Sequence, residues 1–259
     1  MKTTLYEDIN NLLDDLSQNL QIILGKNLVG LYLTGSLTYG DFDYGSSDID
    51  FLAVLDHVLP EKQLSEIKKM HLNIGEKYPR WRKRVEGSYI TKEMFLSTEP
   101  PKEPRPYVNA NKMYNVVYGN EWIINLYALY ESGVTLFGTD LKKLIKPVDI
   151  KKAREASKKN LLDEWKPKLQ EPEPFEEEDY NRDHLQAYAI LTMCRILYLA
   201  KNNSFPSKKT ASSWVKEKYG QPWKDLVEKA GNWKHGKEMN RQQKTLEFIK
   251  FVVNEIGNS

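Results

Sequence analysis

The stretch that decides the fold is LYLTGSLTYGDFDYGSSDIDFLAVLD, which occupies residues 31–56. Two short apolar runs flank a loop that starts with Gly35-Ser36 and ends with the triplet DID at positions 48–50. Apolar runs of this length, bounded by glycine and turn residues, are typical of buried strands. The stretch therefore predicts two strands, with a Gly-Ser turn after the first, opposite two carboxylates at the start of the second.

The two aspartates have the spacing that places both side chains on one face of a strand. Residues at i and i+2 point the same way, so the like charges of Asp48 and Asp50 would repel unless a cation lies between them. Mg²⁺ prefers oxygen ligands and typically binds one or two carboxylates plus substrate phosphates. Because the backbone N–H groups and the hydroxyl of Gly35-Ser36 are suited to a phosphate, we predict that metal and phosphate bind side by side.

A third carboxylate is expected on a neighbouring strand. Glu86 lies in RKRVEGSYI (82–90), the next strand-like segment of the sequence. Beside a metal site this side chain would act as a ligand or as a general base toward an attacking hydroxyl. The alternative is a surface carboxylate that pairs with Arg82 or Arg84.

The N-terminal part of the chain predicts an alternation of helices and strands. Apolar spacing favours helices over residues 4–24 and 61–77, and short apolar runs favour strands over 28–33, 50–55 and 84–90. The order is helix, strand, strand, helix, strand. Residues 99–106 contain four prolines and predict an extended loop.

The remainder of the chain reads as mostly helical. Helices are expected over residues 122–131, 149–165, 183–201, 208–219, 223–230 and 237–256. Residues 171–179 hold six acids and two prolines, which indicates an acidic linker or lid. We therefore expect an α/β (α+β) domain with a mixed sheet over residues 1–143, followed by an all-α helical-bundle domain over residues 144–259.

Composition excludes several classes of protein. The chain has 259 residues, a net charge of +2 and one cysteine. The near-neutral charge makes a nucleic-acid partner unlikely, and a single cysteine cannot form an intrachain disulfide. No apolar run approaches the roughly 18 residues of a spanning helix, and the N-terminus lacks a signal-like apolar core. We expect a cytoplasmic protein without a membrane partner.

The motifs quoted above resemble those of a known superfamily. Gly35-Ser36, eleven intervening residues and DID at 48–50 in an apolar strand resemble the signature of the polymerase-β-like nucleotidyltransferases. ESGVTLFGTDL (131–141) and LTMCRILYLAKNNSFPSKKTASSWV (191–215) resemble the helical C-terminal domain of the aminoglycoside adenylyltransferases that modify streptomycin and spectinomycin. The resemblance covers most of the chain.

This resemblance implies a phosphate-binding role for four residues. Gly35, Ser36 and Ser47 would touch the triphosphate of ATP. Lys208, in SKKTASSW, matches a family lysine that reaches the ATP phosphates from the helical domain. The alternative for Lys208 is an ordinary lysine at the start of a helix.

The resemblance also implies the metal ligands and the catalytic base. Asp48 and Asp50 would bind Mg²⁺, and Glu86 would deprotonate the attacking hydroxyl. ATP would be the substrate, its α-phosphate would be attacked in line, and pyrophosphate would leave. We expect this chemistry in a cleft between the two domains.

The acceptor is expected to be a hydroxylated, cationic small molecule such as an aminoglycoside-like antibiotic. An acidic lining would suit it, and the sequence offers Glu176, Glu177, Glu178, Asp179 and Asp183. The strand around the base reads VEGSYI, and STEPPKEPRPY follows it. Both depart from the family pattern, so the identity of the acceptor does not carry over. Two alternatives stay open, namely transfer to a protein or RNA end and a nucleotide-binding sensor.

Overall fold

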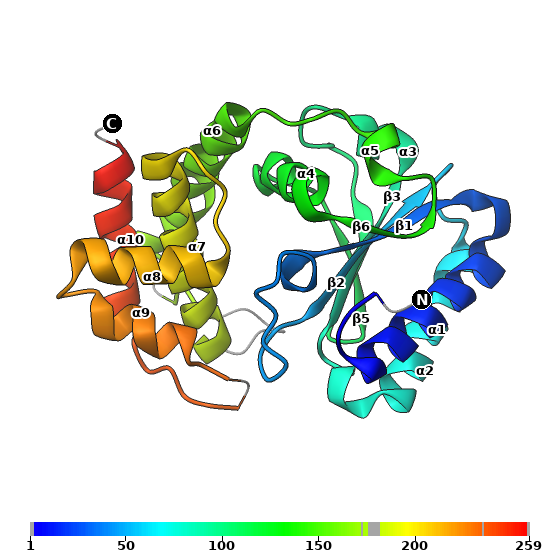
Figure 1. Cartoon of the computed structure of the whole chain (residues 1–259), viewed down its shortest axis with the longest axis horizontal. Coiled ribbons are helices and arrows are strands. Elements are labelled where there is room, and N and C mark those ends of the chain that lie inside the picture. The colour runs from blue at the N-terminus through cyan, green and yellow to red at the C-terminus, as the bar shows by residue number, and fades with distance from the viewer. Residues whose placement is uncertain (1–2, 172, 176–181, 235, 258–259) are drawn as a thin grey trace. The chain divides into compact units, whose positions relative to one another are not determined.

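The computed structural model describes residues 3–171, 173–175, 182–234 and 236–257. The chain divides into two compact units. The first comprises Met1–Phe42 and Ser47–Pro147, and the second comprises Asp43–Ser46 and Val148–Ser259. The first unit contains a sheet with helices, and the described part of the second unit contains helices without a strand (Figure 1). This is the predicted fold class.

A six-stranded mixed sheet forms the centre of the first unit. Its strand order is β5-β4-β3-β2-β1-β6. The pair β2–β3 is parallel, and the other neighbouring pairs are antiparallel. The strands are β1 (Leu28–Thr34), β2 (Ile49–Leu55), β3 (Val85–Thr91), β4 (Arg105–Asn109), β5 (Lys112–Val116) and β6 (Val134–Gly138).

The register of the sheet brings the functional segments to one end. Thr34 at the end of β1 pairs with Asp50 in β2. Asp50 in turn pairs with Glu86 in β3. Because β1 runs antiparallel to β2 while β3 runs parallel to it, the end of β1 meets the beginnings of β2 and β3.

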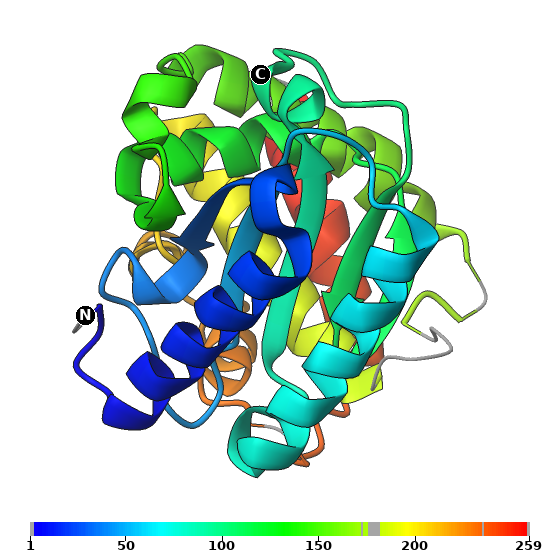
Figure 2. The ribbon, with the colours of Figure 1, turned by 90° about the vertical axis from the view of Figure 1, so that its right-hand side faces the viewer.

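Five helices accompany this sheet. Their bounds are α1 (Glu7–Leu24), α2 (Glu61–Lys77), α3 (Lys92–Leu96), α4 (Glu121–Ser132) and α5 (Leu141–Leu144). Helix α1 is amphipathic as predicted, because Ile9, Leu12, Leu16 and Leu20 are fully buried. Figure 2 shows α1 and α2 lying across the same face of the strands.

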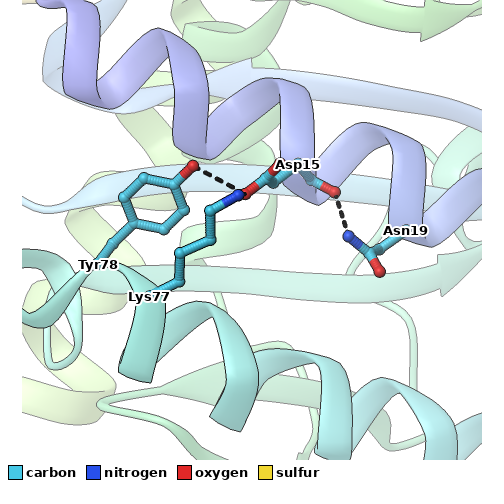
Figure 3. A network of polar contacts seen from close by, with 4 residues as sticks. All are labelled: Asp15, Asn19, Lys77 and Tyr78. Carbon is cyan, nitrogen blue, oxygen red and sulfur yellow. Dashed lines mark hydrogen bonds and ion pairs between the residues drawn. The ribbon is translucent and has the colours of Figure 1, made fainter.

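A polar network joins α1 to the end of α2. The Asp15 carboxylate accepts hydrogen bonds at Oδ2 from Lys77 Nζ at 2.5 Å and from the Tyr78 hydroxyl at 2.7 Å (Figure 3). Partial burial raises the pKa of Asp15, but these two bonds and the charge of Lys77 outweigh it and leave that pKa below its ordinary value of 3.8. The folded state therefore favours the charged form of Asp15.

Replacing Asp15 with asparagine should lower the melting temperature slightly at neutral pH. A depressed pKa adds stability above the ordinary pKa of the group, and this stability is lost as the pH falls through the folded value. We expect Asp15→Asn to lower Tm by about 1–2 °C at pH 7 and the difference to shrink below pH 3.8. Scanning calorimetry at several pH values measures this effect. A Tm difference that persists at low pH would refute it, and Glu66→Gln on the exposed face of α2 is the control.

The second unit packs its helices around a common apolar core. The helices are α6 (Ile150–Asn160), α7 (Arg182–Asn202), α8 (Lys208–Tyr219), α9 (Lys224–Gly231) and α10 (Gln242–Gly257). A π-helical turn, Leu161–Trp165, continues α6. Met193, Leu197, Val215 and Phe248 are completely buried in this core. The predicted helical bundle is thus present.

Helix α10 begins later than predicted, at Gln242 instead of residue 237. The backbone N–H groups of Met239 and Asn240 donate to Oδ1 of Asp183 at 2.6 and 3.1 Å. Asn240 also has a positive φ of 44°, which an α-helix does not allow. A carboxylate on α7 therefore holds residues 239–240 in a loop, and periodicity alone does not reveal that contact.

Three strands fall in segments that the sequence predicts as loop or helix. Strands β4 and β5 form a hairpin whose turn residues, Ala110 and Asn111, both have positive φ. The usual sequence signal for such a two-residue turn is Asn-Gly or Asp-Gly, and this hairpin has neither. Strand β6 is short and begins two residues after the end of α4. It is recognised as a strand by its antiparallel pairing with β1. The predicted loop at 99–106 thus ends in the first residues of β4, and the expectation of a mostly helical remainder is wrong for residues 107–116 and 134–138.

Among the helices that the structure describes, none is both long and apolar enough to cross a membrane.

Candidate active site

The turn after β1 touches the start of β2 at Gly35. Gly35 opens a 3-10 turn, Gly35–Leu37, and has a φ of +71°. A Cβ atom on Gly35 would lie 1.9 Å from Oδ2 of Asp50 and 2.7 Å from its Cγ. A glycine is therefore required at position 35 for two reasons. The backbone is left-handed there, and the Asp50 carboxylate leaves no room for a Cβ atom. The predicted phosphate turn, including the half-buried Ser36, lies beside a predicted metal ligand.

Asp50 and Glu86 are cross-strand neighbours. They pair directly in the parallel register of β2 and β3, so their side chains project from the same face of the sheet. Both side chains are half-buried. The structure thus brings together three of the predicted residues, namely Gly35 in the turn after β1, Asp50 in β2 and Glu86 in β3.

Ser47 and Asp48 are held at the entrance to β2 by Arg84, which precedes β3. The Arg84 side chain donates from Nη2 to the Ser47 carbonyl oxygen, and its Nε lies 3.8 Å from Asp48 Oδ1. The guanidinium stacks 4.5 Å from the centre of the Trp81 ring and is 8% exposed. This buried cation offsets part of the repulsion between neighbouring carboxylates. Arg84 thus pairs with Asp48, whereas the sequence suggested it as a possible partner of Glu86.

Glu86 receives hydrogen bonds from strand β4. The Tyr107 hydroxyl donates to Glu86 Oε1 at 2.5 Å, and Asn109 Nδ2 donates to Oε2 at 3.4 Å. Asn109 Nδ2 also donates to the Tyr107 hydroxyl oxygen at 3.1 Å. Neither residue is predicted from the sequence, because no strand is expected at residues 105–109.

Asp48 and Asp50 offer carboxylate oxygens, the ligands that Mg²⁺ prefers. Within the described ranges, no group of three or more His, Cys, Asp or Glu side chains is arranged to hold a metal by itself. Mg²⁺ does not need such a cage, because it typically takes one or two carboxylates and completes its shell with phosphate oxygens and water. Asp50 lies against the backbone of the Gly35 turn, where such phosphates would bind. The carboxylate oxygens of Asp48 and Asp50 thus suit Mg²⁺ in their chemistry, and their assignment as its ligands stays a prediction.

Lys208 lies in the second unit, at the first position of α8. The preceding Ser207 caps this helix by accepting a hydrogen bond from the Thr210 backbone N–H at 3.0 Å. Lys208 is exposed, and its Nζ lies 5.4 Å from the centre of the Tyr188 ring. Its assignment to the ATP phosphates stays a prediction.

The acidic residues predicted to line an acceptor site divide into two groups. Glu176, Glu177, Glu178 and Asp179 lie outside the described residues. Asp183 is described, and its Oδ1 accepts the two backbone hydrogen bonds of residues 239–240. Asp183 therefore has a structural role in the loop before α10.

Two family models match the chain. The nucleotidyltransferase domain matches residues 9–96. The C-terminal domain of aminoglycoside adenylyltransferases matches residues 143–258. The first segment contains the Gly35 turn, both aspartates and Glu86, and the second contains Lys208.

Individual relatives agree with these matches. The spectinomycin 9-adenylyltransferases of Staphylococcus aureus strains Mu50 and N315 are 24% identical over 211 residues, covering 76% of this chain and 75% of each relative. A crystal structure of a spectinomycin adenyltransferase from Enterococcus faecialis, with ATP and spectinomycin, superposes with a TM-score of 0.73 at 18% identity. That match covers 96% of this chain and 99% of the other, and it shows that the two chains share a fold.

These matches confirm both the predicted superfamily and the predicted fold class. They cover the strands that carry the carboxylates as well as the helical unit. The chain therefore contains a nucleotidyltransferase domain, which is followed by the C-terminal domain of the aminoglycoside adenylyltransferases.

Proposed function

We propose that this enzyme transfers AMP from ATP to a hydroxyl group of an aminoglycoside-like antibiotic and releases pyrophosphate. The observation that carries the proposal is the alignment of the Gly35 turn, Asp50 and Glu86 on adjacent strands. It places a candidate phosphate site, a candidate metal ligand and a candidate base in one row. Relatives that adenylylate spectinomycin support ATP as the donor and make spectinomycin the first acceptor to test.

The phosphate-binding residues and the base have separate tasks in this reaction. The backbone of Gly35 and the hydroxyls of Ser36 and Ser47 bind phosphate oxygens, and Glu86 takes the proton of the attacking hydroxyl. Catalysis then rests mainly on positioning and on neutralising charge.

The remaining residues would bring positive charge to the phosphates, the two aspartates through a bound metal ion and Lys208 through its own ammonium group. Asp48 and Asp50 would hold Mg²⁺, which when bound neutralises charge on the phosphate oxygens. We assign Lys208 to the triphosphate as well, on the strength of its place in SKKTASSW and its exposure at the start of α8. A cationic acceptor and an anionic donor would thus meet a site with charges of both signs.

Pyrophosphate release provides the test of this function. Purified protein would be mixed with ATP and Mg²⁺, with spectinomycin or streptomycin as acceptor and a reaction without acceptor as control. We expect release that requires the acceptor, stops when EDTA removes the metal, and returns when excess Mg²⁺ is added.

Three results would contradict parts of the proposal. ATP binding without acceptor-dependent release would exclude the antibiotic acceptors tested. Transfer of label from α-labelled ATP to a protein or an RNA end would assign the same site to a macromolecular acceptor. Release that is unaffected by EDTA would remove Mg²⁺ from the reaction.

A further inference from the structure

Two side chains of β4 hold the candidate base in place, and no task has yet been assigned to them. Tyr107 and Asn109 both bond to Glu86, and they bond to each other. The antiparallel register pairs Gly87 with Val108 and Ser88 with Tyr107. Glu86 flanks Gly87, and Tyr107 and Asn109 flank Val108, so these three side chains project from the same face of the sheet. The three side chains form a closed triangle of hydrogen bonds.

The direction of these bonds follows from the groups involved. A tyrosine hydroxyl has one proton and can accept as well as donate. The Tyr107 hydroxyl donates its one hydrogen bond to the Glu86 carboxylate. Its oxygen therefore accepts the hydrogen bond from the Asn109 amide. Bonds linked in this way polarise and strengthen one another, and a bond to a charged carboxylate is stronger than a neutral one.

Glutamate needs such support when it serves as a base. Its side chain has several rotatable bonds, and a base must lie about 2.6–3.2 Å from the proton it takes. A misplacement of about 1 Å can cost about 100-fold in rate. Both Tyr107 and Asn109 come from a strand that is fixed on either side, by β3 and by β5.

We propose that Tyr107 and Asn109 are positioning residues for Glu86, which they hold in the orientation required for deprotonating the acceptor hydroxyl. This inference rests on the proposed function. It predicts that loss of either bond slows the chemical step and leaves ATP binding unchanged, because neither side chain is assigned to the phosphates.

A matched tyrosine provides the control. Tyr114 pairs with Tyr107 across β4 and β5, and the centres of the two rings lie 6.4 Å apart. Both side chains are half-buried. Removal of the hydroxyl from Tyr114 tests what loss of a tyrosine hydroxyl does on the strand next to Tyr107.

The experiment compares Tyr107→Phe, Asn109→Ala and Tyr114→Phe with the wild type in acceptor-dependent pyrophosphate release. We expect Tyr107→Phe to lower kcat about tenfold and Asn109→Ala about threefold, with KM for ATP and Tm close to wild type. Tyr114→Phe should keep the wild-type kcat. Combined with Glu86→Gln, the Tyr107→Phe change should have almost no further effect, because no base is left to orient.

The outcomes separate this inference from the proposed function. An active wild type with a Tyr107→Phe variant of equal kcat would overturn the inference alone. A loss of kcat that tracks a loss of Tm, or that Tyr114→Phe reproduces, would also overturn it, because either result indicates a structural role. A wild type without acceptor-dependent turnover would overturn the proposed function and this inference together.

Discussion

Replacing Glu86 with glutamine should lower the rate of AMP transfer about 1,000-fold and leave ATP binding nearly unchanged. Glutamine has the same shape and can still accept the bond from Tyr107, but it cannot take a proton at neutral pH. Single-turnover kinetics measures the rate of transfer, and calorimetric titration with ATP measures binding. The loss should therefore appear in the chemical step alone.

The control for this variant is Glu93→Gln. Glu93 is an exposed glutamate in the first turn of α3, so its replacement changes the net charge equally. We expect its transfer rate to equal that of the wild type. If Glu86→Gln transferred AMP at the wild-type rate, Glu86 would have no part in the proton transfer.

Replacing Gly35 with alanine should lower the rate of transfer about 100-fold or more. The added methyl group would lie 1.9 Å from Oδ2 of Asp50, so the turn or the carboxylate must move. Because the turn and Asp50 serve the same nucleotide in the proposed reaction, we expect a raised KM for ATP together with a lower kcat. Steady-state kinetics at varied ATP and Mg²⁺ concentrations measures both.

Gly40 provides a control for backbone strain. Its φ of +80° lies in the same left-handed region, and a Cβ atom on it would meet nothing within 4 Å. Both alanine variants should lose about 1–2 kcal/mol of folding free energy from strain. Equal activity of Gly35→Ala and Gly40→Ala would show that the contact with Asp50 has no part in catalysis.

Much of the candidate site follows from local sequence because its spacing is set by strand geometry. The apolar runs on both sides of residues 35–50 define two strands, and the alternation of side chains places the carboxylates on one face. Glu86 was then found as the acid of the next strand, and the structure pairs it with Asp50. These inferences need only short-range patterns and one parallel pairing.

The supporting residues could not be found in the same way. Tyr107 and Asn109 reach Glu86 through a hairpin whose turn has no glycine signal, so their strand was not expected. Arg84 is one of three basic residues at 82–84, and only the pairing of β2 with β3 singles it out as the partner of Ser47 and Asp48. Such contacts depend on tertiary structure, and the spacing of residues within one segment does not reveal them.

The same limit applies to the second unit. The spacing of apolar residues predicted its helices, because each helix buries one face in the shared core. It placed the start of α10 too early, because Asp183, whose carboxylate binds the backbone before α10, lies more than fifty residues earlier in the sequence. Apolar spacing does not report a contact of this kind.

The most direct test of the central claim is the chemical identity of the acceptor after reaction with ATP and Mg²⁺. Spectinomycin incubated with the enzyme should gain the mass of one AMP, joined through a phosphodiester that ³¹P NMR detects, and Glu86→Gln should give almost none of this product. Spectinomycin and streptomycin recovered unmodified, with ATP consumed or its α-phosphate found on a protein or RNA, would contradict the account.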